Sequence, residues 1–392
     1  MTPQDAQAFE QLLANCADEP IRSPGAIQPH GVLLTLSEPE LRIQQISANV
    51  EALLGQPAAQ VLGQPLEQLL GDTDGQRIRE VLQLPRLSDA PPLHLAVNGA
   101  RFEGLLHRHQ GVLMLELEIQ LEHLQPQHLK EQTENLGRLL RRLQTAKTLN
   151  ELYTISVSEI QAMTGYDRVL IYRFEEEGHG QVIAEATRPT MEVFNGLFFP
   201  ASDIPQQARE LYRSNWLRII PNADYQPVPL LPALRPDTQQ ALDLSFATLR
   251  SVSPIHCQYM KNMGVLSSMS ISLLKGDQLW GLISCGNRQP LLVPHELRIA
   301  CQTIGQVLSL QISAMEALDI SRQREEKVAA LASLDQAMRD TPDSVFDGLT
   351  QVPQLLLELT QAGGVAIIED KQLHCFGTVS YTHLTLPTKR IV

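Results

Sequence analysis

The chain has 392 residues, of which 43% are hydrophobic and 19% charged, with a formal net charge of −13 and a pI near 5.3. This length suggests two or three domains, and the acidic balance argues against a general nucleic-acid or anionic-membrane surface. No apolar run approaches the roughly 18 residues that span a bilayer, and the opening MTPQDAQAFEQLL lacks the basic residues of a signal peptide. We therefore expect a cytoplasmic protein that binds neither nucleic acid nor membrane.

The five cysteines are odd in number and contain no CxxC pair, which fits neither a disulfide framework nor a zinc site. Cys16 lies in ANCADEPIRSPGAIQPHG, a segment punctuated by Pro and Gly and outside any periodic element. A thiol on such an exposed arm is available for covalent chemistry. The other four cysteines are more typical of buried or idle thiols: Cys257, Cys285, Cys301 and Cys375.

Residues 25–120 alternate short strand-like runs with one small helical patch, ANVEALLG. The runs GVLLTL, LRIQQIS and GVLMLELEIQL predict a small α+β domain with a mostly antiparallel sheet. GVLMLELEI alternates with period two, which predicts a half-buried strand.

A second α+β block begins with a helical pattern from about 130 to 165, where Leu136, Leu139, Leu140 and Leu143 share one stripe. Strands are predicted at RVLIYRF, GQVIAEA, SSMSISLLK and QLWGLISCG. Between them, residues 188–254 form a long irregular stretch rich in Pro, Arg and aromatic residues. Loops of that length inside a compact domain are usually functional.

From Pro294 to about Met338 the chain contains no proline and only one glycine, Gly305, in some 40 residues. A helix of this length would run roughly 60 Å at 1.5 Å per residue, which is more than one small domain needs. One reading is a core helix with a charged extension into solvent. An apolar stripe along it is formed by Ile304, Val307, Leu308, Ile312, Met315 and Leu318. We favour a helix that joins two domains and also pairs with a second copy in a dimer.

Polar residues interrupt several apolar segments of the second block. Asp203 stands in FFPASDIPQQAR, although a buried carboxylate costs several kcal/mol unless a cation or donor meets it. Taken singly, His256 and Tyr172 are typical core residues, and arginines such as Arg218 and Arg250 usually pair with an acid. Together they describe a large apolar slot for a flat ligand with a cationic middle and anionic arms.

With these motifs the chain resembles the photosensory part of a bacteriophytochrome, a light receptor built of PAS, GAF and PHY domains around a linear tetrapyrrole. The resemblance covers residues 10 to about 320 closely and the start of the PHY domain more weakly. It is carried by NCADEPIRSPGAIQPHG, YDRVLIYRF, FPASDIPQQAR, LRSVSPIHCQYMKNMGV and LWGLISC.

The resemblance implies an α+β fold of PAS and GAF domains, each an antiparallel sheet with flanking helices. A figure-of-eight knot links the two domains, and a long spine helix follows. The implied boundaries are 1–24 for an N-terminal arm, 25–125 for PAS, 130–318 for GAF, and 319–392 for the spine continuation and a truncated PHY domain. A homodimer through the GAF and spine helices is also implied.

The resemblance implies biliverdin IXα as the cofactor, bound by a thioether at Cys16, with Cys257 as a second thiol nearby. Asp203 and His256 would flank the pyrrole nitrogens, and Arg218 and Arg250 would hold the propionates. Aromatic residues and Met263 would line the space in which ring D swings. The complete implied set is Cys16, Tyr172, Phe194, Phe199, Asp203, Ile204, Pro205, Tyr212, Arg218, Arg250, Ser253, His256, Tyr259, Met263, Ser268 and Ser270.

Two departures from the family pattern stand out. The family usually has a ring D histidine after LWGLISC, whereas this chain has Gly286-Asn287-Arg288. A PHY domain should extend well past 450, but SVFDGLTQVPQLLLELTQAGG leads only to residue 392, and SYTHLTLPTKRIV continues neither pattern. We expect a truncated or misassembled reading frame.

The implied function is red/far-red light sensing, as the sensory part of a two-component histidine kinase. No kinase module is recognisable, so we expect a sensor and not an enzyme, with its output domain missing. Two alternatives remain: an enzyme that acts on tetrapyrroles, and a bilin-free PAS–GAF module that binds another ligand or a partner protein.

Overall fold

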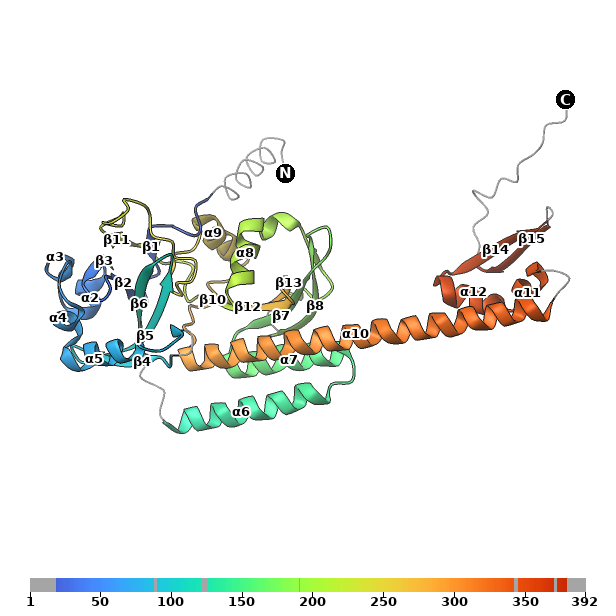
Figure 1. Cartoon of the computed structure of the whole chain (residues 1–392), viewed down its shortest axis with the longest axis horizontal. Helices are drawn as coiled ribbons and strands as arrows, with labels where there is room; N and C mark the ends of the chain where they lie inside the picture. Colours follow the sequence, from blue (N-terminus) through green and yellow to red (C-terminus); the bar gives the residue numbers. More distant parts are fainter. Residues whose placement is uncertain are drawn as a thin grey trace, which may run out of the picture. The chain divides into compact units, whose positions relative to one another are not determined.

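The computed structural model describes residues 19–87, 90–120, 126–189, 191–341, 345–369 and 372–378. It divides into two compact units, Met1–Gln311 and Ile312–Val392 (Figure 1). The first unit contains the two larger sheets and the second a two-stranded sheet.

The first sheet is antiparallel and has seven strands in the order β1-β11-β3-β2-β6-β5-β4. Its strands are β1 (Ala26–Ile27), β2 (Gly31–Leu36), β3 (Ile43–Ser47), β4 (Leu93–Val97), β5 (Ala100–His109), β6 (Val112–Ile119) and β11 (Val228–Leu231). Strand β11 comes from the second α+β block, so the two blocks share this sheet.

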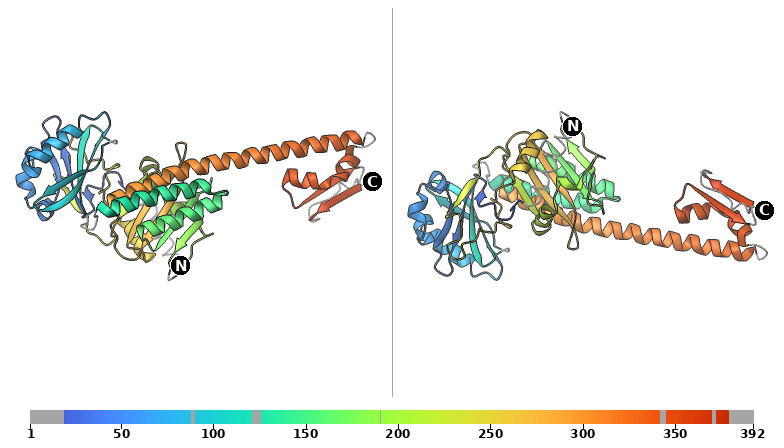
Figure 2. Two further views of the ribbon diagram at one scale, coloured as in Figure 1. Left: turned by 90° about the horizontal axis from the view of Figure 1, so that it is seen from below. Right: turned by 90° about the horizontal axis from the view of Figure 1, so that it is seen from above.

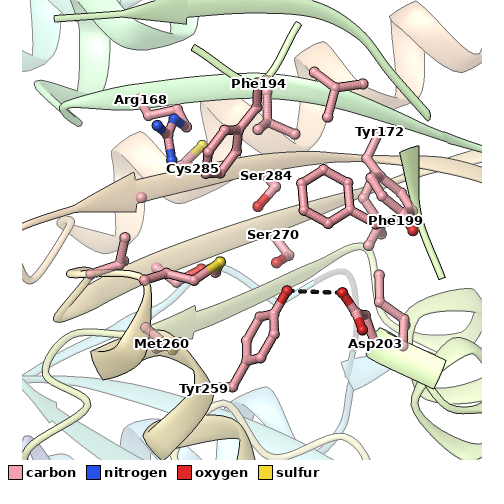
Figure 3. A pocket seen from close by; sticks show the side chains of 18 of the residues that line it. Arg168, Tyr172, Phe194, Phe199, Asp203, Tyr259, Met260, Ser270, Ser284 and Cys285 are labelled. Carbon is pink, nitrogen blue, oxygen red and sulfur yellow. Dashed lines mark hydrogen bonds between the residues drawn. The ribbon is translucent and has the colours of Figure 1, made fainter. Parts of the chain in front are cut away.

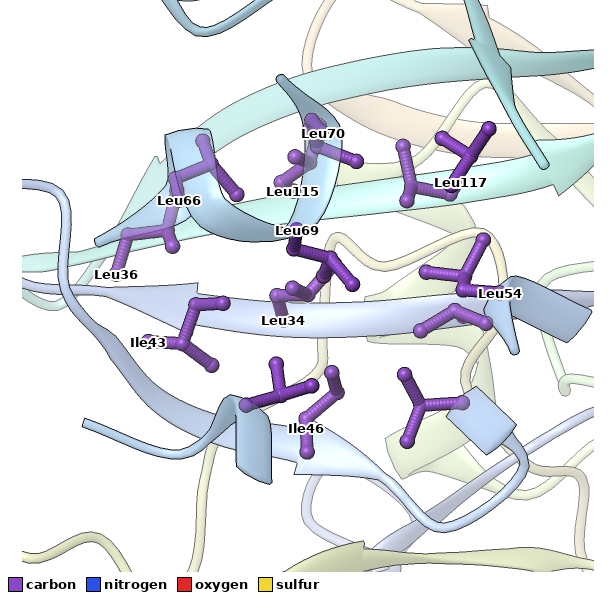
Figure 4. Close-up of a cluster of buried hydrophobic side chains, with 14 of the residues drawn as sticks. Leu34, Leu36, Ile43, Ile46, Leu54, Leu66, Leu69, Leu70, Leu115 and Leu117 are labelled. Atoms are coloured by element: carbon purple, nitrogen blue, oxygen red, sulfur yellow. The ribbon is translucent and has the colours of Figure 1, made fainter. Parts of the chain in front are cut away.

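Four short helices between β3 and β4 pack over one face of this sheet (Figure 4). They are α2 (Val50–Leu54), α3 (Ala58–Val61), α4 (Leu66–Leu70) and α5 (Asp72–Val81). Leu34, Leu115 and Leu117 of the sheet are fully buried against them. Each such leucine stabilises the fold by about 1.5–3 kcal/mol relative to an exposed one.

Strand β6 is buried on both faces, so the expectation of a half-buried strand is wrong. Glu116 and Glu118 lie on the second face, yet their exposed fractions are only 1% and 3%. This face is covered by Leu242, Leu244 and Leu249 of the loop that follows β11, and by Arg298. A tertiary contact therefore covers the face that the alternating pattern assigns to solvent.

The segment before β2 is hydrogen-bonded to strand β11 on one side and to the loop that follows β11 on the other. Gly25 accepts from the N–H of Leu230 at 3.0 Å on one side, and Ala26 accepts from the N–H of Ser251 at 3.1 Å on the other. These contacts agree with the predicted link between the PAS and GAF domains.

The second sheet has six strands in the order β10-β12-β13-β7-β8-β9. Its strands are β7 (Arg168–Phe174), β8 (Gly180–Thr187), β9 (Phe198–Phe199), β10 (Leu217–Ile220), β12 (Ser267–Lys275) and β13 (Gln278–Asn287). Helix α7 (Leu149–Thr164) and the first part of α10 (His295–Asp340) lie on one face, and α6 (Pro126–Thr145) packs against α7 (Figure 1 and Figure 2).

Helix α10 confirms the long helix predicted from about Pro294. It approaches the sheet closely at Gly305, where a Cβ atom would lie 2.5 Å from Cγ2 of Ile271. The opposite face of the sheet is covered by the 3₁₀ helix η2 (Ala201–Asp203) and helices α8 (Gln206–Ser214) and α9 (Pro254–Asn262). Residues 188–254, which the sequence predicts to be irregular, thus include regular elements.

The second unit consists of the rest of α10 from Ile312, helices α11 (Val345–Gln351) and α12 (Pro353–Thr360), and the hairpin of β14 (Gly364–Glu369) and β15 (Gln372–Gly377). The stretch SYTHLTLPTKRIV, which the sequence predicts to continue neither pattern, lies outside the described residues. Among the described residues, none of the helices combines the length and apolar character needed to cross a bilayer.

Candidate functional site

A cavity lies between the six-stranded sheet and the segment that carries η2, α8 and α9 (Figure 3). It contains about 920 Å³ of space between atoms, its open mouth included. Most of its lining is apolar or aromatic with a few polar groups, which is the usual composition of a site for an organic ligand.

The floor of the cavity follows from the period-two alternation of three adjacent strands. Odd-numbered residues such as Ile271 and Ile283 face the helices and are fully buried. Even-numbered residues face the cavity: Arg168, Leu170 and Tyr172 of β7, Ser268 and Ser270 of β12, and Leu282, Ser284 and Gly286 of β13.

Asp203 enters the cavity from η2 and accepts a hydrogen bond from the hydroxyl of Tyr259 at 3.0 Å (Figure 3). Burial raises the pKa of Asp203 above its usual range, and the Tyr259 hydroxyl opposes that shift. Tyr172 lies close enough for the Asp203 charge to raise its own pKa, although burial contributes more. The Tyr172 hydroxyl is buried without a hydrogen-bond partner in the described structure.

His256 lies on α9 with its ring stacked near that of Tyr259, at 6.2 Å between centroids and 19° between planes. Burial lowers the pKa of His256 to about 4, and the Arg218 charge acts in the same direction. The imidazole is therefore neutral near pH 7. The hydroxyl of Ser253 accepts a hydrogen bond from the backbone N–H of His256 at 3.3 Å and so caps the N-terminus of α9.

One end of the cavity is aromatic. The rings of Phe194 and Phe199 lie 5.7 Å apart, and Phe199 lies 6.2 Å from Tyr172. The guanidinium carbon of Arg168 stands 3.7 Å from the centre of the Phe194 ring, while its Nε lies 2.9 Å from Glu185. These flat side chains suit the faces of a planar ligand.

Arg218 and Arg250 lie beside this cavity and do not line it. Arg218 is paired with Ser270 across β10 and β12, and Arg250 is only 7% exposed. Both guanidiniums bond to backbone carbonyls, and Nε of Arg250 has no partner in the described structure. No ion pair with a carboxylate is seen for either arginine among the described residues, contrary to the usual pairing with an acid.

The structure thus brings most of the predicted site residues around one cavity. They are Tyr172, Phe194, Phe199, Asp203, Ile204, Tyr212, His256, Tyr259, Met263, Ser268 and Ser270. Pro205, Arg218, Arg250 and Ser253 lie nearby without lining it, and Cys16 lies outside the described residues. Cys257 is buried in a cluster with Ile220 and Met260.

Sequence reasoning did not single out Arg168, Met260, Val265 and Ser284, which also line the cavity. The alternation of the strand RVLIYRF could have indicated Arg168, because it shares a face with Tyr172. Gly286 lines the cavity as well, and a Cβ there would meet only the Val265 methyls at 3.5 Å, an ordinary contact.

Among the described residues, no group of three or more His, Cys, Asp or Glu is arranged to hold a metal ion.

Comparison with known proteins gives two family matches, the PAS fold at residues 16–120 and the GAF domain at residues 148–312. A structure from R. palustris, described as the chromophore-binding domain of an unusual bacteriophytochrome, is 42% identical. It has a TM-score of 0.73 and covers 78% of this chain and 99% of its own. The chain belongs to the bacteriophytochrome family.

Other relatives of this bacteriophytochrome agree. The photosensory core module of a Stigmatella aurantiaca phytochrome is 43% identical with a TM-score of 0.81, covering 93% of this chain and 72% of its own. Cyanobacterial phytochrome B of Nostoc is 41% identical over 92% of this chain. A Pseudomonas aeruginosa bacteriophytochrome is 36% identical over 91% of it. The chain spans about half the length of these two curated relatives, 48% of each.

Proposed function

We propose that this bacteriophytochrome module binds biliverdin IXα and senses red and far-red light through it. The observation that carries the proposal is the apolar cavity with two guanidiniums beside it, that of Arg218 half-buried and that of Arg250 buried, neither of which forms an ion pair with a carboxylate of the described residues. Relatives whose structures are described as chromophore-binding domains support it.

The residues present fit such a pigment. The serine and aliphatic floor and the aromatic end offer flat surfaces to a planar conjugated system. Two arginines that form no ion pair among the described residues suit a pair of propionate arms, because forked guanidinium–carboxylate bonds are strong. The Tyr172 hydroxyl, which lines the cavity, has no hydrogen-bond partner in the described structure and is available to a ligand.

The centre of the cavity suits a cationic group. Asp203 offers its carboxyl group and its backbone to one side of the ligand. His256 is a neutral imidazole, one nitrogen of which can accept a hydrogen bond. A protonated pigment in an apolar slot needs acceptors of this kind to keep its proton. When bound, the pigment supplies the photochemistry, isomerisation about one bridge double bond. The chain's aromatic side chains shape the space for that motion.

Covalent attachment is proposed at Cys16. The thiol adds across a vinyl group of ring A, so that one carbon–sulfur bond forms, the thiol proton moves to the other vinyl carbon, and no oxidant is needed. Cys257 is a poorer candidate, because it is buried and burial raises the pKa of its thiol.

The remaining parts of the proposal concern signalling. Relatives are about twice as long, and the family resemblance implies that the module passes its signal to a histidine kinase. A homodimer is proposed through the GAF helices and α10, which exposes Leu310, Leu318 and Ile320 by 73%, 70% and 61%. We also propose that the chain is cytoplasmic.

Attachment is tested by producing the chain with a haem oxygenase and staining the denatured protein for zinc-induced bilin fluorescence. Cys16→Ala should abolish the fluorescent band and leave some pigment bound without a covalent bond, while Cys257→Ala keeps the band. A band that survives Cys16→Ala and disappears with Cys257→Ala would move the attachment to Cys257.

A further inference from the structure

Glu116 of strand β6 is a buried carboxyl of the PAS domain that touches the GAF loop at 247–250. Its Oε1 accepts from the backbone N–H of Thr248 at 3.1 Å, and its Oε2 accepts from that of Leu249 at 2.7 Å. Only 1% of Glu116 is exposed. The carboxylate therefore grips two successive peptide groups from one side.

Arg218 holds the same two peptide groups from the other side. Its Nη1 donates to the carbonyl of Thr248 at 2.9 Å and to that of Ala247 at 3.4 Å. The Ala247 carbonyl and the Thr248 N–H belong to one peptide unit, and the Thr248 carbonyl and the Leu249 N–H belong to the next. Each unit thus joins the Glu116 carboxylate to the Arg218 guanidinium, and such chains of hydrogen bonds strengthen one another.

The charges favour the same arrangement. Burial lowers the pKa of Arg218, and the charge of Glu116 is among those that oppose the shift. Burial and the charge of Glu118 raise the pKa of Glu116 to about 7, while the two loop N–H groups and Arg218 favour its ionised form. His107 Nδ1 lies 3.6 Å from Glu116, but burial lowers the pKa of His107 to about 4, so this ring is neutral near pH 7.

We propose that Glu116 is a positioning residue of the ligand site, which sets the place and charge of Arg218 through the peptide groups of the 247–249 loop. A guanidinium has five N–H donors, and the loop carbonyls that Arg218 meets are those of Ala247, Thr248 and Arg250. Donors remain for an anionic arm of the ligand. The PAS domain in this way completes a binding site that lies in the GAF domain. The proposal rests on the proposed function and names the part of the ligand concerned, its carboxylates.

The test compares biliverdin with its dimethyl ester, which has the same ring system but no free carboxylate. Binding is titrated by absorption with the full chain carrying Cys16→Ala, so that it is reversible. Glu116→Gln keeps the shape of the side chain and removes its charge. We expect it to raise the Kd of biliverdin about tenfold, the cost of losing a charge-assisted contact, and to leave the Kd of the ester unchanged within about twofold.

Two controls separate positioning from general stability. Glu103→Gln changes another buried carboxyl, on the adjacent strand β5, which faces Glu296 and not the loop. It should leave both Kd values unchanged. In the Arg218→Met variant, adding Glu116→Gln should not raise the Kd of biliverdin further, because Glu116 is proposed to act on the ligand only through Arg218. Glu116→Asp, which keeps the charge but withdraws it by one methylene, should show the same selectivity and serves if the Gln variant does not fold.

Equal weakening of both ligands by Glu116→Gln would make the residue a structural clamp and overturn the proposal, as would unchanged binding of both. If the parent chain binds neither pigment, the proposed function fails first, and this proposal falls with it.

Discussion

Asp203 meets a tyrosine hydroxyl and not a cation in the described structure. A carboxyl in an apolar pocket with one neutral donor keeps a raised pKa, because no positive charge offsets its burial. Such a group can change its protonation or its partner at little cost. At the scale of single residues, we therefore see Asp203 and Tyr259 as the adaptable pair of the cavity.

Tyr259→Phe should raise the pKa of Asp203 further, since it removes the hydrogen bond that opposes the effect of burial. The protonated carboxyl band of Asp203 in infrared spectra should then persist to higher pH than in the parent chain. Asp203→Asn identifies the band.

Tyr172→Phe is the matched control, because it removes the same atom from a neighbouring tyrosine whose hydroxyl has no hydrogen-bond partner in the described structure. It should not shift the Asp203 titration upward. An unchanged or lower Asp203 pKa in Tyr259→Phe would show that this hydrogen bond does not control the carboxyl.

Gly286→His should be tolerated and should alter the pigment spectrum. A Cβ at Gly286 meets only ordinary contacts, and replacing a strand glycine can stabilise by up to about 1 kcal/mol. We expect an unchanged or slightly higher Tm and a sharper red band, from the added imidazole in the cavity. Gly281→His on the same strand is the contrast, because its Cβ would lie 2.5 Å from the Tyr172 carbonyl oxygen and should destabilise the fold. A strongly unstable Gly286→His chain would contradict this view of the site.

At the scale of elements, the start of α10 is fastened to the PAS sheet by a buried ion pair. Arg298 of the helix bonds both carboxylate oxygens of Glu118 on β6, and their side chains are 5% and 4% exposed. Burial alone would raise the pKa of Glu118, but Arg298 and other nearby groups outweigh it, and the pKa lies below its ordinary value. Helix α10, at which the homodimer is proposed, is thus attached to both the PAS sheet and the GAF sheet.

Arg298→Met should destabilise the chain by about 3–5 kcal/mol, because it leaves a buried carboxylate without its partner. Glu118→Leu combined with Arg298→Met should recover most of that loss, since no buried charge is then left unpaired. Urea unfolding of the two single variants and the double variant measures the coupling. Strictly additive losses would show that the pair contributes nothing specific.

The sequence predicts the strands and the long helix well where apolar periodicity is local, as in RVLIYRF and in the α10 segment. It fails at β6, because Glu116 and Glu118 look like a solvent face and only the distant loop and α10 bury them. The cavity residues were found through the motif resemblance and not through periodicity. The contacts of Glu116 depend on a loop more than 130 residues away, as its separation of 132 from Thr248 shows, and no local pattern contains that information.

At the scale of the whole molecule, the PAS–GAF junction collects buried ionisable groups. Burial raises the pKa of Glu103 to about 8, with Glu296 and Glu118 acting in the same direction and Arg298 against it. Burial lowers the pKa values of His30 and His295 to about 4. These groups make the stability of the first unit depend on pH.

The folded chain keeps the Glu103 proton that the unfolded chain releases near its ordinary pKa of 4.5. Its contribution to stability is therefore present at low pH and is lost as pH rises toward about 8. The buried histidines act oppositely and add stability as pH rises from about 4 to 6.5. We expect the highest Tm near pH 6.5, followed by a decline that Glu103→Gln flattens. The exposed Glu40→Gln is the control and should keep the decline of Tm above pH 6.5. If Glu103→Gln shows the same decline, this assignment is contradicted.

Light sensing through a bound bilin requires that red illumination change the absorption of the purified chain. The chain is produced with a haem oxygenase, purified in the dark, and its absorption spectrum is recorded before and after red illumination. We expect a bound pigment whose red absorption band loses intensity under red light. We also expect the denatured chain to show zinc-induced bilin fluorescence that depends on Cys16. A purified, folded chain with no pigment, or with a pigment whose spectrum red light does not change, would contradict light sensing through a bound bilin.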